Sequence, residues 1–127
     1  MGRPWGRAIW LLLALAGCEA EPVPAALLHV WRTDAPAYAG RHLEIRKNTV
    51  VFGTGPYTSD FHPILGVDSK PVEPGSTLYT IHYRADDGAR LQLRVVLTPG
   101  MPDLLRIDHL DEVWRAGPEP VCPEKGV

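Results

Sequence analysis

Apolar and polar residues alternate along most of the chain between His29 and Gly117, with frequent breaks at Gly, Pro and Asp. Alternation with a period of two is typical of β-strands that bury one face. No long stretch has helical periodicity, and one helical turn at most is predicted within residues 33–41. The pattern therefore predicts roughly eight short strands in sequence order, including 29–33 and 61–67, without an internal repeat.

The segment at residues 77–98, TLYTIHYRADDGARLQLRVVLT, gives the strongest strand signal. A two-residue loop at 87–88 would mix apolar and polar side chains on one face. A three-residue loop at 86–88 separates them, because a slip of one residue turns every side chain over. Gly88 then takes the left-handed position of the loop at no steric cost. The predicted pairs are Tyr83–Leu91, Ile81–Leu93 and Tyr79–Val95, and the predicted solvated face holds His82, Arg84, Arg90, Gln92 and Arg94.

Two further hairpins follow from the same pattern. In residues 41–55, a two-residue loop at Lys47–Asn48 places apolar residues directly opposite one another, where they share a face. In residues 104–117, LLRIDHLDEVWRAG, the predicted turn lies at 110–111. The predicted pairs are Ile45–Val50 and Leu43–Phe52 in the first hairpin, and Ile107–Trp114 and Leu105–Ala116 in the second.

Consecutive hairpins predict an all-β, antiparallel meander. A meander this small must close into a barrel or fold into two sheets, because open strand edges invite aggregation. A small barrel is the predicted fold, with a β-sandwich as the alternative. Inward residues of small barrels mostly fill the interior, but buried phenols and indoles need polar partners. The candidate ligand-facing residues are Tyr79, Tyr83, Trp31 and Trp114.

The first and last predicted strands carry related tetrads, HVWR at 29–32 and EVWR at 112–115. This layout is similar to the lipocalin-like barrels, which carry a tryptophan on the first strand and an arginine on the last strand that covers it. The resemblance implies that Trp31 lies under Arg115, since a guanidinium packs well on an indole face. It also implies a barrel whose first and last strands are neighbours. His29 stands where those barrels carry a glycine.

The beginning of the chain has the pattern of an export signal. Arg3 and Arg7 precede a short apolar run that ends in Leu15-Ala16-Gly17-Cys18. The run is shorter than the roughly twenty residues of a membrane-spanning helix. The tetrad resembles the lipobox of bacterial lipoproteins, which implies cleavage between Gly17 and Cys18 and lipidation of Cys18. An ordinary secretory signal is the alternative interpretation.

The chain is thus predicted to contain a signal peptide at 1–17, a lipidated tether at 18–28, a β-barrel domain at 29–117 and a disordered Pro-rich tail at 118–127. Lipidation implies attachment to a membrane of the cell envelope, facing the periplasm. Glu19 is not the aspartate associated with inner-membrane retention, which favours the outer membrane. Loss of the leader leaves eleven basic and fifteen acidic residues. A mildly acidic chain without a basic run argues against a nucleic-acid partner.

No catalytic motif is found, so the chain is predicted not to be an enzyme, and no cofactor is expected. The spacing of the five histidines matches no metal-ligand pattern, and no metal site is predicted. If Cys18 is lipidated, Cys122 has no partner within the chain. Two hypotheses remain. One is a non-catalytic binding module for a small apolar ligand or partner. The other is a solid-core interaction or inhibitory domain that contacts an envelope protein through loops 53–63 and 98–103.

Overall fold

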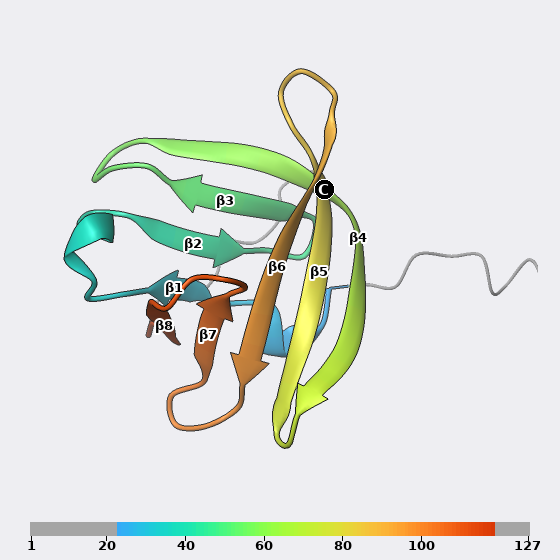
Figure 1. Cartoon of the computed structure of the whole chain (residues 1–127). Helices are drawn as coiled ribbons and strands as arrows, with labels where there is room; N and C mark the ends of the chain where they lie inside the picture. Colours follow the sequence, from blue (N-terminus) through green and yellow to red (C-terminus); the bar gives the residue numbers. More distant parts are fainter. Residues whose placement is uncertain (1–22, 119–127) are drawn as a thin grey trace, which may run out of the picture.

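The computed structural model describes residues 23–118, which form a closed β-barrel. Eight antiparallel strands follow one another around the barrel in sequence order, and β1 pairs with β8 to close it (Figure 1). The prediction of an all-β meander is therefore confirmed, and it takes the form of a barrel rather than a sandwich. Among residues 23–118 no helix has the length and apolar character needed to cross a bilayer.

The elements are short except in the middle of the chain. Two 3-10 turns, η1 and η2, flank the first strand, and η2 falls where one helical turn was predicted. In chain order the elements are η1 (Ala25–Leu27), β1 (Val30–Arg32), η2 (Pro36–Tyr38), β2 (His42–Ile45), β3 (Thr49–Gly53), β4 (Ser59–Glu73), β5 (Ser76–Arg84), β6 (Arg90–Thr98), β7 (Leu104–Ile107) and β8 (Val113–Ala116).

Two of the three predicted hairpins have the predicted register. In the β5–β6 hairpin the pairs Tyr83–Leu91, Ile81–Leu93 and Tyr79–Val95 all form. Its loop is closed by the Ala85 amide, which donates to the Ala89 carbonyl at 2.9 Å, and Gly88 has a φ of 89°. The β2–β3 hairpin contains the predicted pairs Ile45–Val50 and Leu43–Phe52. Alternation of apolar residues thus determined both registers.

The register predicted for the last hairpin is wrong by two residues. Leu105, rather than Ile107, lies opposite Trp114, and the loop spans residues 108–112. His109 in this loop has a φ of 71°, and the Leu110 amide donates to the Ile107 carbonyl at 2.9 Å. Ile107 pairs instead with Val95 of β6. A shift of two residues keeps every side chain on its face, so the apolar pattern cannot distinguish the two registers.

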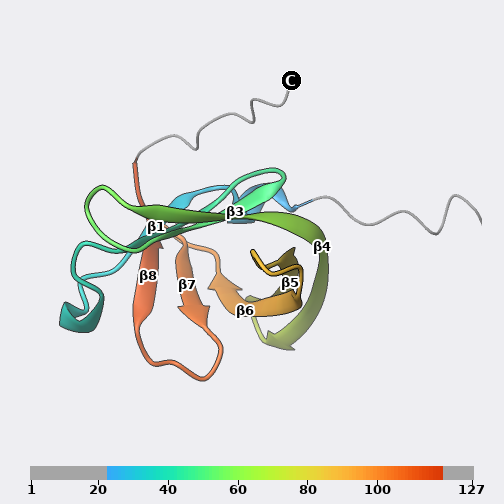
Figure 2. The same cartoon turned by 90° about the horizontal axis from the view of Figure 1, so that it is seen from above.

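β4 is more than twice as long as the strand predicted at 61–67. Its first part pairs with β3 and its second part with β5, with a register shift between Ile64 and Gly66. A bulge bends a strand and increases its twist, and glycine commonly marks such a bend. Seen from above, β4 curves around the barrel and joins the two halves of the sheet (Figure 2).

The interior of the barrel is filled by apolar side chains. The buried core consists of Leu27, Trp31, Leu43, Ile45, Val50, Val67, Ile81, Leu93, Val95, Leu97, Leu105 and Trp114. Leu27 belongs to η1, within the segment that was predicted to be a tether, and it is 0% exposed. Val23 and Ala26 also lie against this core. The packed domain therefore begins before residue 29.

The two ends of the barrel differ. We call the end where β1 begins the closed end, because η1 lies there and Leu27 packs into the core. The opposite end, where β1, β3, β5 and β7 finish, is called the mouth. The loops at the mouth span residues 33–41, 54–58, 85–89 and 108–112.

Trp31 is sealed at the closed end, but not by Arg115 as the resemblance implied. Its indole Nε1–H donates to the Leu27 carbonyl at 3.2 Å, and the His29 ring lies edge-on to it at 5.2 Å. Trp31 pairs with Ala116, whereas Arg115 pairs with Arg32. Neighbouring residues of a strand point to opposite faces. Arg115 is therefore on the outer face while Trp31 fills the interior.

Candidate functional site

An apolar pocket of about 150 Å³ lies at the mouth of the barrel. Its walls come from four inward-facing strand residues and from a tyrosine of the 33–41 loop. The full lining consists of Tyr38, Arg41, His42, Leu43, Phe52, Gly53, Thr54, Ile107 and Trp114. Small-molecule pockets usually measure roughly 300–1,000 Å³, whereas about 150 Å³ suffices for a benzene ring. The pocket therefore has room for a single ring or a branched apolar group.

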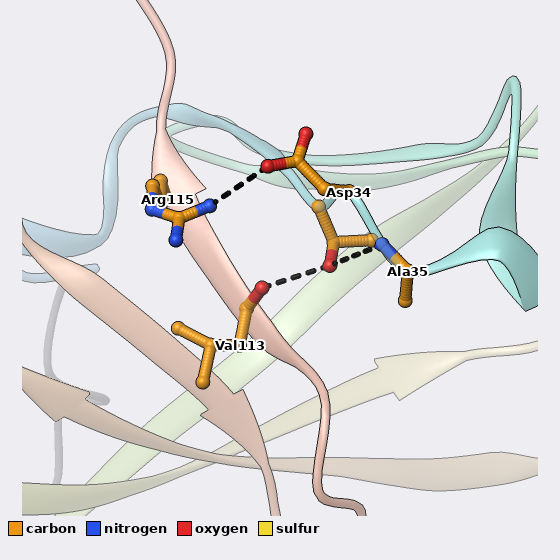
Figure 3. Close-up of polar contacts among 5 residues, drawn as sticks. Asp34, Ala35, Val113 and Arg115 are labelled. Carbon is orange, nitrogen blue, oxygen red and sulfur yellow. Dashed lines mark hydrogen bonds and ion pairs between the residues drawn. The ribbon is translucent and has the colours of Figure 1, made fainter.

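The 33–41 loop is held over the mouth by contacts to β8. The Thr33 hydroxyl donates to the Val113 carbonyl at 2.8 Å and accepts from the Ala35 amide at 3.3 Å. Beside it, Arg115 Nη1 lies 3.2 Å from Asp34 Oδ2 (Figure 3). The ion pair is exposed and contributes little by itself. Together these contacts fix where the loop leaves β1.

Tyr38 closes one side of the pocket. It ends η2, where its amide donates to the Ala35 carbonyl at 3.0 Å. Its ring meets the Trp114 ring edge-on, with 5.4 Å between centroids and 61° between planes. Edge-to-face packing is a favoured arrangement of two aromatic rings. The loop therefore brings an aromatic wall to the pocket that the strands alone do not supply.

His42 and Gly53 form the rim on the side of β2 and β3. The two residues are direct cross-strand partners. A Cβ atom at position 53 would collide with the imidazole ring of His42. Glycine at position 53 therefore leaves the space that the His42 ring occupies over the neighbouring strand.

A cluster of three rings adjoins the pocket behind Phe52. The centroids of Phe52, His62 and Tyr83 lie 5.4–5.7 Å apart in all three pairs. His62 Nδ1 lies 3.1 Å from the Arg84 carbonyl oxygen, which can only accept, so this nitrogen carries the proton. Burial raises the pKa of the Tyr83 phenol above its ordinary value of 10.0. The cluster supports Phe52, the ring that it shares with the pocket.

The four candidate ligand-facing residues are not gathered in one place. Trp114 lines the pocket, and Tyr83 lies next to it through Phe52. Trp31 is buried at the closed end, and Tyr79 is partly buried against the core near the start of β5. The sites of cleavage and lipidation, Gly17 and Cys18, lie outside the described residues.

Of the nine lining residues, only Trp114 was among the predicted ligand-facing residues. Leu43, Phe52 and Ile107 were predicted only to face inward, and no role was predicted for Tyr38, Arg41 and His42. The last three come from the 33–41 loop and the residue that follows it. The position of this loop depends on its contacts to β8, and hydrophobic periodicity does not predict such long-range contacts. The aromatic residue within the predicted helical turn was the only available signal.

Other candidate features of the sequence are separate from the pocket. Among residues 23–118 no three His, Cys, Asp or Glu side chains are grouped so that they could hold a metal ion. The loops proposed to contact a partner lie at opposite ends, 54–58 at the mouth and 99–103 at the closed end. A larger bay of about 620 Å³ at residues 71–77 is lined by one hairpin only and has no opposing wall.

No protein-family model matches this chain, and comparison with curated proteins and with solved structures likewise gives no match. The residues of the pocket therefore provide the evidence for the function.

Proposed function

We propose that the protein is a non-catalytic binding module, lipid-anchored in the cell envelope, whose barrel mouth receives one small apolar group. The observation that carries this proposal is the 150 Å³ apolar pocket at the mouth of an otherwise filled barrel. The anchor rests on the Leu15–Cys18 sequence alone. Mass spectrometry of the mature protein tests it, since a diacylglyceryl group on Cys18 is required.

The size of the pocket restricts the ligand. A long acyl chain needs a cavity that penetrates the barrel, but the inward positions of the strands are occupied by the buried core. A ring or a short branched group fits the pocket with its apolar surface against Trp114, Phe52 and Tyr38. Burial of apolar surface contributes about 25 cal/mol per Å², so a ligand of this size binds weakly, in the micromolar to millimolar range.

The two described tryptophans provide the test. The full chain is labelled with 5-fluorotryptophan and titrated with benzyl alcohol, and ¹⁹F signals are assigned by Trp→Phe replacement. We expect the Trp114 signal to shift in a saturable way while the Trp31 signal stays fixed, because Trp31 is sealed at the closed end. Decan-1-ol, a neutral long chain, should give no tighter binding. A Trp114 signal that is insensitive to benzyl alcohol would contradict the proposal.

A matched pair of tyrosine variants locates the binding. Tyr38→Ala removes a wall of the pocket and should weaken benzyl alcohol binding about five- to tenfold, the worth of one aromatic contact. Tyr57→Ala removes a tyrosine of the neighbouring loop that is 98% exposed and lines no part of the pocket. It should leave the affinity unchanged. Equal effects of both variants would place the binding elsewhere.

The second candidate function is an interaction domain, and it has one observation in its favour. Four exposed apolar side chains lie in or beside three of the mouth loops: Tyr57, Leu91, Leu110 and Val113. Such residues are typical of protein contacts when they form a patch. Cross-linking from position 57 in intact envelopes tests this candidate, and absence of a stoichiometric partner would exclude it.

A further inference from the structure

The rim of the pocket differs in character from its walls. None of its nine lining residues is acidic, and Arg41 at the rim carries a charged guanidinium with five N–H donors. An apolar interior with donors at its edge matches a ligand that has an apolar body and an acceptor group at one end. The rim therefore indicates which polar group the ligand has, whereas the volume of the pocket indicates only the size of the ligand.

The Arg41 side chain is available to a ligand. Within residues 23–118 neither the Arg41 guanidinium nor the His42 ring has a hydrogen bond or an ion pair. The backbone of Arg41 is fixed, because its amide donates to the Tyr38 carbonyl at 2.9 Å. The arginine thus sits next to the aromatic wall of the pocket with its side chain uncommitted. Arginine stays charged at every physiological pH and recognises carboxylates with paired N–H groups.

Nearby carboxylates do not cancel this charge inside the pocket. Asp34 is paired with Arg115 at 3.2 Å, and Asp108 lies 3.5 Å from Arg94. The remaining acidic residues of the mouth loops do not line the pocket.

We propose that the pocket selects small aromatic or branched carboxylates, with the apolar body in the pocket and the carboxylate at the Arg41 guanidinium. This inference rests on the proposed function and adds the chemical class of the ligand to it. An ion pair at a partly exposed rim distinguishes the carboxylate from a neutral ligand of the same shape by about tenfold in affinity.

Benzoate and benzyl alcohol are nearly equal in shape and differ in charge, so their affinities form the test. Both are titrated into the fluorotryptophan-labelled full chain, with the Trp114 signal as the readout. We expect benzoate to bind about tenfold more tightly. Arg41→Gln should abolish that preference, Arg41→Lys should restore part of it, and Arg90→Gln should keep it, because exposed Arg90 lies outside the pocket.

The outcomes separate the two proposals. Equal affinities for benzoate and benzyl alcohol would overturn the carboxylate preference and leave the proposed function standing. A preference that survives in Arg41→Gln, or that is lost equally in Arg90→Gln, would also overturn it. Absence of any Trp114 response to either probe would overturn the proposed function itself. An unmoved Trp31 signal shows in each variant that the barrel is folded.

Discussion

Replacement of Leu27 by alanine tests whether the barrel domain begins before its first strand. Leu27 is 0% exposed and lies in the core at the closed end. The substitution removes about three methylene equivalents, each contributing about 0.8 kcal/mol on burial. The space that remains is hard to close, because the Leu27 carbonyl stays bonded to the Trp31 indole. Transfer and cavity terms together predict a loss of about 2–5 kcal/mol of unfolding free energy.

A leucine at the mouth provides the matched control. Leu91 faces inward in the β5–β6 register but is 44% exposed, since its end of the hairpin extends past the core. Leu91→Ala should cost about 1 kcal/mol, in proportion to the area that is buried. The variants are compared by urea and thermal unfolding, where each kcal/mol corresponds to about 4–8 °C in melting temperature. Equal losses in the two variants would refute the assignment of η1 to the folded domain.

Three further variants probe single features. Gly53→Ala should lower the unfolding free energy by about 1–3 kcal/mol, because its methyl group displaces the His42 ring; an unchanged unfolding free energy would disprove that packing. Gly88→Ala should cost about 1 kcal/mol by denaturation, whereas Gly88→Asn should cost less, since asparagine tolerates a positive φ; equal costs would contradict this. Tyr83 has a raised pKa in the folded state, so its contribution to stability is complete below pH 10 and is lost as pH rises above it. Tyr83→Phe should lessen this alkaline loss of unfolding free energy. Identical pH profiles of unfolding free energy for the native chain and the variant would refute this prediction.

Much of the barrel follows from the sequence, because strands with one buried face must alternate. This requirement selected the three-residue loop around Gly88, since the competing loop reverses the faces. It failed in the last hairpin, where both registers bury the same side chains. There the choice depends on the 108–112 loop, whose residue His109 adopts a left-handed conformation that sequence pattern does not reveal.

The candidate site was predictable only in part. Trp114 was identified because apolar alternation placed it on the inward face, and it lines the pocket. The positions of Tyr38 and Arg41 depend on long-range contacts, such as the Thr33 hydroxyl to the Val113 carbonyl across 80 positions of sequence. Likewise, Arg115 faces outward because it pairs with Arg32. Which face a strand residue occupies depends on the register of the strands, and the sequence does not reveal this register here.

Closure of the barrel determines how an anchored molecule is oriented. The Gly117 amide donates to the Val30 carbonyl at 2.8 Å, so both ends of the described chain emerge at the closed end. The five residue-to-residue steps from Cys18 to Val23 span at most about 18 Å. A lipid on Cys18 would hold the closed end near the headgroups and direct the pocket away from the bilayer. A ligand would then arrive from the aqueous compartment, as a water-soluble carboxylate can, rather than by lateral transfer out of the lipid.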